Sequence, residues 1–170
     1  RYKCIPQEYQ DKMVYVGAFD MDLCADGKSY YVGIMEYVWD GVVYDFIDNE
    51  EFFGGDKPYT NLIDDIPKYC YFSKAALAAL NYMDWIPNII HCHDWQTGMV
   101  PALLKIQYAH FPFYQNIKTA YTIHNLQYQG VFPIPQVQDI LNLGDSLFTN
   151  DKLECYGCAN YLKAGLVYAD

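Results

Sequence analysis

A predicted strand followed by a helix and a second strand, in the middle of the chain, constrains the fold more than any other feature. Residues 86–92 and 118–123 are short apolar runs with β-branched side chains, each of a length typical of a buried strand. Between them a helix is predicted from Thr97, with Pro101 in its early part, where proline is tolerated. Strands and helices that alternate through short links indicate a parallel sheet. The sequence therefore predicts an α/β, Rossmann-like domain.

A β-hairpin is predicted ahead of this unit. Residues 30–37 and 42–47 are rich in aromatic and β-branched side chains. Asp40 and Gly41 separate them, and this pair is favoured where a tight hairpin turn needs positive φ. Residues 48–67 have no periodicity and many Asp, Asn, Gly and Pro residues, so we predict a long excursion there.

Three further helices are predicted around the same core. The first is capped by Ser73 and ends before Pro87. A loop over residues 124–135 precedes a short helix near residues 137–141, and a long helix is expected from about residue 152 to 169. We detect no internal repeat that would divide the chain.

Charge and hydropathy exclude two classes of partner. The net charge is −10 with only 11 Lys and Arg residues, whereas nucleic acids and anionic lipids require clustered positive charge. Apolar residues make up 52% of the chain, but no apolar run approaches the roughly 20 residues that cross a bilayer. We therefore expect a globular domain with neither a nucleic-acid nor a membrane partner.

The six cysteines follow no disulfide framework, and a chain of 170 residues does not need one. We therefore expect reduced thiols and a cytoplasmic location. Cys155 and Cys158 form a lone CxxC, which is a weak zinc signal without a second pair. The cysteines occupy positions 4, 24, 70, 92, 155 and 158.

Polar side chains follow both predicted parallel strands. The first cluster reads HCHDWQTG over residues 91–98, and the second reads TIHNLQYQG over residues 122–130. Ligands of open parallel sheets lie beyond the carboxyl ends of the strands, so these clusters are the candidate site.

Structural roles compete with functional ones in both clusters. Asp94 and Thr97 are also suited to cap the helix that begins there, which is compatible with lining a cleft. His91 and His93 alternate onto one strand face, and we expect at least one of them to be a buried, hydrogen-bonded histidine. Residues 127–130 alternatively form only a tight turn, with glycine at position 130 for its backbone freedom.

The stretches HCHDWQTGMVPALLK (91–105) and TIHNLQYQGVFP (122–133) resemble the two signature motifs of glycogen and starch synthases of bacterial type. Residues 5–12 and 153–170 resemble other segments of that family, so the resemblance covers nearly the whole chain. It implies that residues 1–170 are part of the amino-terminal, acceptor-side domain of a two-domain GT-B glycosyltransferase. The first strand with its glycine-rich lysine motif and the carboxyl-terminal nucleotide-binding domain would then be absent.

The resemblance also implies an activity. Glucose would pass from ADP-glucose to the non-reducing end of an α-1,4-glucan, with retention and without a cofactor or metal. The isolated chain would be inactive, because the family's nucleotide-binding domain is a required partner. Loss of an inner strand would expose a sheet edge and favour self-association. The location would be the cytoplasm, or the plastid stroma in a plant.

The same resemblance assigns roles to individual residues. His124 matches the histidine that contacts the donor glucose near its 6-hydroxyl, and Asn125 lies in the same pocket. Asp94 matches a carboxylate near the reacting sugars, so Asp94 and His124 are the expected catalytic residues. Tyr59 matches a loop tyrosine that closes on the substrate. The remaining expected substrate-binding residues are Trp95, Gln127 and Gly130.

General chemistry agrees with these roles. Sugar hydroxyls need matched donors and acceptors, and an unmatched buried polar group costs about 1 to 3 kcal/mol. Retaining glucosyl transfer passes through an oxocarbenium-like state, which carboxylates and fixed dipoles stabilise.

Two other functions remain open at this point. A metal-dependent hydrolase would use His91, His93 and Asp94, because imidazoles at alternate strand positions can share a metal. A non-catalytic glucan-binding module would use the aromatic residues, which make up 18% of the chain.

Overall fold

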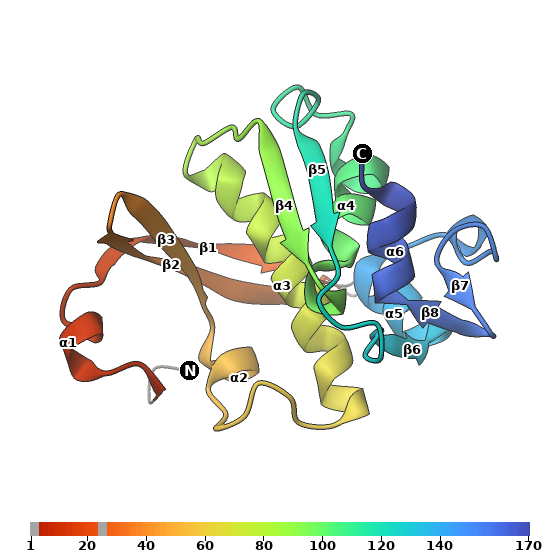
Figure 1. Cartoon of the computed structure of the whole chain (residues 1–170), viewed down its shortest axis with the longest axis horizontal. Coiled ribbons are helices and arrows are strands. Elements are labelled where there is room, and N and C mark those ends of the chain that lie inside the picture. The colour runs from red at the N-terminus through yellow and green to blue at the C-terminus, as the bar shows by residue number, and fades with distance from the viewer. Residues whose placement is uncertain (1–3, 24–26) are drawn as a thin grey trace.

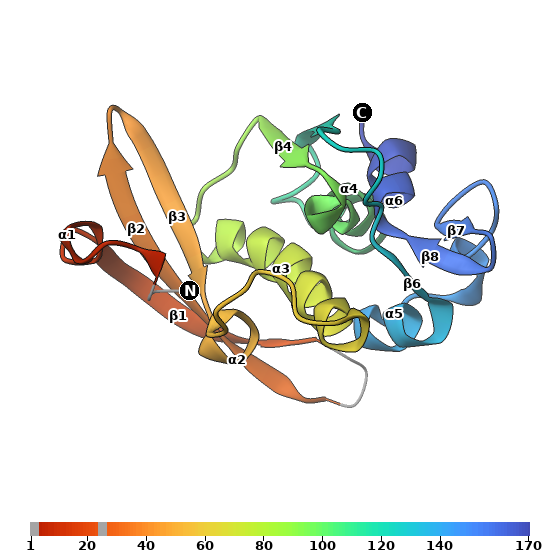
Figure 2. The ribbon, with the colours of Figure 1, turned by 60° about the horizontal axis from the view of Figure 1, so that its bottom comes forward.

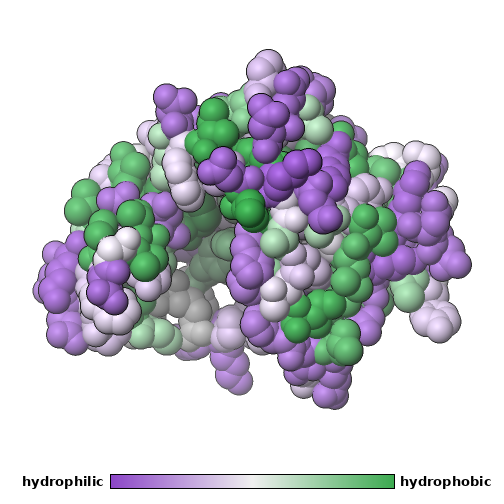
Figure 3. Space-filling model, turned by 45° about the horizontal axis from the view of Figure 1, so that its top comes forward, coloured by the Kyte–Doolittle hydropathy of each residue, from purple (hydrophilic) through white to green (hydrophobic). Residues whose placement is uncertain are grey.

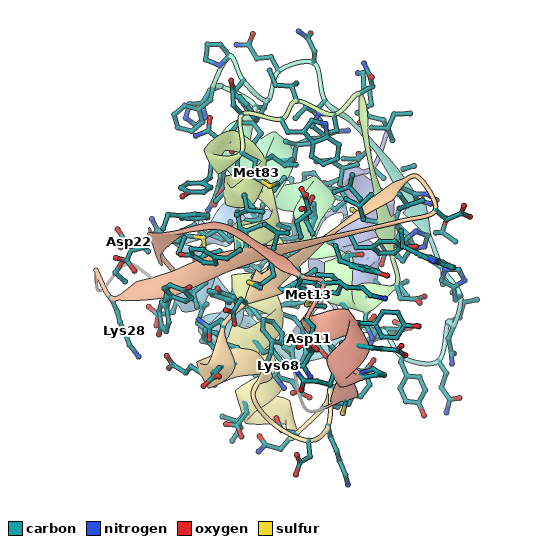
Figure 4. All side chains as sticks on the ribbon, turned by 90° about the vertical axis from the view of Figure 1, so that its left-hand side faces the viewer. Asp11, Met13, Asp22, Lys28, Lys68 and Met83 are labelled. Atoms are coloured by element: carbon teal, nitrogen blue, oxygen red, sulfur yellow. The ribbon has the colours of Figure 1, made fainter. Side chains whose placement is uncertain are left out.

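The computed structural model describes residues 4–23 and 27–170. An antiparallel sheet lies on one side of the long helix α3 (Leu62–Tyr82), and a parallel strand pair lies on the other (Figures 1 and 2). Viewed from the hairpin side, the antiparallel sheet crosses in front of α3, with Lys68 and Met83 marking opposite parts of that helix (Figure 4). This mixture of parallel and antiparallel sheets confirms the predicted α/β class.

The antiparallel sheet contains the predicted hairpin and one strand that was not predicted. Strands β2 (Ser29–Trp39) and β3 (Val42–Asp48) pair around Asp40 and Gly41, whose φ angles are 49° and 76°. Both values lie in the left-handed region that a tight hairpin turn requires. Strand β1 (Val14–Asp22) pairs with the other edge of β2, and the short helix α1 (Gln7–Gln10) precedes it.

Helix α3 begins well before the predicted cap, so that prediction is wrong. Asn61 is the N-cap, and its side chain accepts hydrogen bonds from the second and third helical amides. Ser73 lies in the helix interior, fully buried, and its hydroxyl has no hydrogen-bond partner among the described residues. Pro67 inside the first two turns concealed this start, because proline normally signals a helix boundary.

The predicted excursion is correspondingly shorter. It contains one turn of helix, α2 (Glu50–Phe53), which is capped by the side chain of Asn49. Residues 54–61 then lead into α3, and Tyr59 lies on this link.

The predicted strand, helix and strand unit is confirmed. Strands β4 (Ile89–His93) and β5 (Lys118–Thr122) pair in parallel, with His93 opposite Thr122. The connection between them contains three consecutive helical segments, all close to the expected position. They are η2 (Trp95–Thr97), α4 (Met99–Leu103) and the π-helical η3 (Leu104–Tyr108).

The long helix predicted over residues 152–169 is wrong in its first half. Tyr156 and Gly157 have φ angles of 51° and 79°, so the chain turns there and forms a hairpin. A helix begins only after Asn160, whose side chain accepts a hydrogen bond from the Lys163 amide. The elements of this region are β6 (Val131–Pro133), α5 (Ile134–Leu141), η4 (Asp145–Leu147), β7 (Glu154–Cys155), β8 (Cys158–Asn160) and α6 (Tyr161–Tyr168).

The CxxC pair therefore closes a hairpin. Cys155 and Cys158 are opposite each other in β7 and β8, and both are free thiols. Cys24 lies outside the described residues.

The core is continuous from α3 to α4 and α6. Its largest fully buried side chains include Tyr71 and Leu77 of α3, Leu103 of α4 and Tyr161 of α6. Cys92 of β4 belongs to the same buried cluster, and Tyr121 of β5 packs against it. Within the described residues, none of the helices combines the length and apolarity that a membrane span needs.

Candidate functional site

The two polar clusters meet where β4 and β5 end. The Asp94 amide donates to the Thr122 carbonyl oxygen (2.9 Å), which extends the strand pairing by one residue. Asp94 Oδ1 then accepts hydrogen bonds from the backbone amides of His124 (2.6 Å) and Asn125 (3.4 Å). One carboxylate oxygen thus fixes the loop that leaves the neighbouring strand. Residues 30 positions apart in sequence are held side by side.

Asp94 has an unusual backbone for this task. Its φ of 57° and ψ of −179° belong to a region that is essentially restricted to glycine, at a cost of about 1 to 3 kcal/mol. Its side chain makes no capping hydrogen bond to η2, so the capping interpretation is wrong for Asp94. Thr97 instead bonds back to the strand, because its hydroxyl lies 2.7 Å from the His93 amide and 2.8 Å from the His93 carbonyl oxygen.

A hollow of about 860 Å³ opens beside this junction. Six of the seven predicted site residues line it, from both clusters and from the link before α3. They are Tyr59, Asp94, Trp95, Asn125, Gln127 and Gly130. The seventh, His124, is exposed and adjoins the hollow without lining it, although its backbone is held by Asp94.

Sequence reasoning missed other residues of the wall. Gln96, Tyr128 and Gln129 lie within the two motifs, so their position was a usable signal. Asn61 and Asp65 also line the hollow, and they were missed because the start of α3 was misplaced.

Aromatic rings form the floor of the hollow. The Trp95 indole is only 8% exposed and contacts Tyr69 edge to face at 4.7 Å between ring centroids. Tyr59 lies over it with nearly parallel rings, 6.0 Å apart and inclined by 29°. Gly130 has a φ of 63°, and a Cβ there would lie 2.4 Å from the indole. Gly130 therefore lets the second cluster approach the Trp95 ring closely.

The link that bears Tyr59 is anchored at its base. Inside the protein, Lys68 Nζ donates to Asp65 Oδ1 (3.2 Å) and to the Pro58 carbonyl oxygen (3.1 Å). Asp65 also accepts from the Thr60 amide and hydroxyl. The Tyr59 ring itself is 48% exposed, and its hydroxyl accepts a hydrogen bond from the Gln96 side chain. Closure of Tyr59 on a substrate remains a prediction.

The prediction that His91 or His93 is buried is wrong. Both are exposed, and Cys92 between them faces the core. Burial raises the pKa of the Cys92 thiol to about 12, so this thiol stays protonated at neutral pH. Alternation along β4 therefore places both imidazoles on the opposite, exposed face of the sheet.

The exposed histidines form a short chain of contacts with His124. His91 Nε2 lies 2.7 Å from the Thr122 hydroxyl, and His93 Nδ1 lies 3.0 Å from His124 Nε2. The residues that a metal-dependent hydrolase would use, His91, His93 and Asp94, are thus each hydrogen-bonded to other groups of the protein. The described residues contain no group of three His, Cys, Asp or Glu side chains that could hold a metal ion.

Comparison with known proteins identifies several similar chains. A family model described as the starch synthase catalytic domain matches residues 1–170. The glycogen synthase of Lachnospira eligens is 52% identical over 170 residues, all of this chain and 35% of that protein. The glycogen synthase of Lachnoclostridium phytofermentans is 49% identical over 169 residues, which are 99% of this chain and 35% of that protein.

A solved structure is also similar. The catalytic domain of starch synthase IV from Arabidopsis thaliana, bound to ADP and acarbose, superposes with a TM-score of 0.74 at 27% identity. The match covers 91% of this chain and 33% of that one. This chain thus spans about a third of the length of the curated relatives that it matches.

Proposed function

Because this chain belongs to the starch synthase catalytic domain family, we propose that it is the acceptor-side part of a glycogen or starch synthase. The whole enzyme would transfer glucose from ADP-glucose to the non-reducing end of an α-1,4-glucan, with retention. The observation that carries the proposal is the anchoring of the His124 and Asn125 backbone by the Asp94 carboxylate, at the edge of a hollow of sugar size.

Asp94 is suited to act on the reacting sugar. Oδ1 takes both backbone hydrogen bonds, while Oδ2 accepts none from the described residues. A carboxylate held in this way faces the hollow with a fixed negative charge, and such a charge stabilises positive charge that develops at an anomeric carbon. The strained backbone of Asp94 is consistent with this role, because strain is often retained at functional sites.

The other residues would bind and orient the sugars. The Asn125 side chain at the hollow and the imidazole of His124 beside it offer donors and acceptors to hydroxyl groups. Trp95 and Tyr59 offer aromatic surface on which a sugar ring can pack. The backbone N–H of Gln127 donates to Asn125 Oδ1 (2.9 Å), which fixes the orientation of the Asn125 side chain.

The donor phosphates would be bound elsewhere. None of the described residues that line the hollow is Lys or Arg, and the chain as a whole carries a charge of −10. A nucleotide diphosphate needs positive charge or oriented amides. We therefore assign that function to the part of the longer protein that the relatives have beyond the matched third, and we expect no transfer by the 170-residue chain alone.

A chimera tests this function. The matching segment of the Lachnospira eligens glycogen synthase is replaced by this chain, which covers it at 52% identity. We expect the purified chimera to incorporate radioactive glucose from ADP-glucose into glycogen, whereas the isolated chain does not. A folded chimera without incorporation would contradict the proposal. Retention of that inactive chimera in amylose gels would favour a glucan-binding module instead.

We also propose that the isolated chain self-associates through the free edge of β4. Among the described residues β4 pairs only with β5, and Trp85, Ile86 and Ile89 beside the free edge are each more than half exposed. Figure 3, in which the top of the view of Figure 1 comes forward, shows hydrophobic residues exposed among hydrophilic ones. Unpaired strand edges of this kind recruit other strands.

Light scattering after size exclusion checks this expectation. We expect a mass above that of one chain, and a return to one chain in Ile89→Lys, because a charged side chain blocks an edge. Ile63→Lys is the control, since Ile63 is 77% exposed on α3. A monomeric wild-type chain at all concentrations would refute the idea.

A further inference from the structure

The rings of His93 and His124 form a hydrogen-bonded pair at the carboxyl ends of the two parallel strands. His93 Nδ1 and His124 Nε2 are 3.0 Å apart. The rings are inclined by only 19°, yet their centroids are 5.2 Å apart, which is farther than the two nitrogens. The rings therefore meet edge to edge in nearly one plane, as an N–H···N hydrogen bond requires.

The backbone on each side of the pair is held independently of the hydrogen bond. The His93 backbone is bound on both sides by the Thr97 hydroxyl, at 2.7 Å and 2.8 Å. The His91 ring packs against the His93 ring, with centroids 4.2 Å apart. The His124 backbone is fixed by Asp94 Oδ1 at 2.6 Å. The two backbones and the His93 ring are thus placed by contacts that do not depend on the bond between the imidazoles.

A bond between two neutral imidazoles couples their tautomers. A neutral imidazole carries one N–H and one acceptor nitrogen. If His93 Nδ1 carries a proton, His124 Nε2 accepts the hydrogen bond. The single N–H of the neutral His124 ring must then be at Nδ1. If His124 Nε2 carries the proton, then His124 Nδ1 is an acceptor. In both cases the bond allows His124 only one tautomer for a given state of His93.

We infer that His93 is a positioning residue that fixes the ring orientation and the tautomer of His124, and so decides whether its outer nitrogen, Nδ1, donates to or accepts from a sugar hydroxyl. The inference rests on the proposed function only for the identity of the ligand. A sugar hydroxyl can both donate and accept, so a fixed tautomer selects one hydroxyl orientation at no further cost on binding.

Nitrogen NMR of the ¹⁵N-histidine chain tests the inference without substrate, at about pH 8, where an ordinary imidazole is neutral. We expect a scalar coupling between His93 Nδ1 and His124 Nε2 across the hydrogen bond, and ¹⁵N shifts of His124 that correspond to a single tautomer. His93→Phe keeps a ring but no nitrogen, so the His124 shifts should move to the average of two exchanging tautomers.

His93→Asn is the rescuing variant, because its side-chain NH2 can donate to His124 Nε2 from near the position of Nδ1, which leaves the His124 proton on Nδ1 and keeps one tautomer. His91→Phe is the matched control, since His91 touches His93 but not His124, and it should leave the His124 shifts unchanged. Backbone spectra report whether each variant is folded.

The inference is overturned if the folded wild-type chain shows no coupling, or if His124 keeps one tautomer in folded His93→Phe. An inactive chimera with the coupling intact would contradict the proposed function but not the inference about His93 and His124. An active chimera without the coupling would remove only the present inference.

Discussion

Replacing Gly98 with alanine is expected to lower the free energy of unfolding by about 3 kcal/mol, the upper end of the usual overpacking range. A Cβ at this position would lie 1.9 Å from the Tyr161 carbonyl oxygen and 2.6 Å from its carbon. Both are backbone atoms at the start of α6, so a side-chain rotation cannot relieve the clash. The segment that carries η2 and α4 must separate from α6, and these elements support the end of β4.

Urea denaturation followed by circular dichroism measures this loss. Gly144→Ala is the matched control, because Gly144 has a φ of −73° and a Cβ there would meet nothing nearer than 4.0 Å. We expect its effect to stay within about 0.5 kcal/mol. Equal midpoints for Gly98→Ala and the wild-type chain would show that the contact between η2 and α6 is looser than described.

Replacing Asp94 with alanine in the chimera is expected to lower glucose transfer roughly 100-fold or more, the scale for losing a fixed charge-stabilising group. The change removes the charge that faces the hollow and both acceptor contacts to the His124 and Asn125 amides. Asp94→Asn retains an oxygen that can accept from those amides. It should lose only the part of the transfer rate that depends on the negative charge. The initial rate of incorporation into glycogen is the measurement.

Asp84→Ala is the control for this substitution. Asp84 is exposed, has a positive φ of 52° like Asp94, and lies just beyond the end of α3, outside the hollow. It thus reports the effect of removing an aspartate with positive φ outside the hollow. If Asp84→Ala slows transfer as much as Asp94→Ala, the loss does not come from the charge at the hollow.

Local sequence patterns were sufficient to predict the elements that contain a characteristic turn pair or a short apolar run. Asp40 and Gly41 predicted the hairpin, and the apolar runs that became β4 and β5 predicted the parallel pair. The prediction failed where elements are very short. Strands β7 and β8 have two and three residues, too few to show alternation, so the apolar content of residues 152–169 resembled a continuous helix.

Other errors were a missed helix cap and a misjudged sheet face. The excursion was predicted to run to Pro67 and the cap to be Ser73, yet Asn61 caps α3 six residues before Pro67. At least one of His91 and His93 was expected to be buried, but burial depends on whether another element covers that face of the sheet. Within residues 4–23 and 27–170 neither histidine is covered in this way, and both are exposed.

The sequence predicted which residues line the candidate site, but it did not predict the hydrogen bonds among them. The two motifs contain Asp94, Asn125 and Gly130, all of which line the hollow. No pattern along the chain showed that the Asp94 carboxylate would accept the amides of the next strand's loop, or that His93 would bond to His124. Such contacts follow from the register of β4 against β5, which exists only in the folded sheet.

The central claim is that the hollow beside Asp94 binds the sugars of a glucosyl transfer. A crystal structure of the chimera with ADP and acarbose, the ligands of the similar starch synthase structure, tests it most directly. We predict sugar rings in the hollow, within hydrogen-bonding distance of Asp94 and Asn125 and packed against Tyr59 or Trp95. Acarbose bound elsewhere, with the hollow beside Asp94 left empty, would contradict the account.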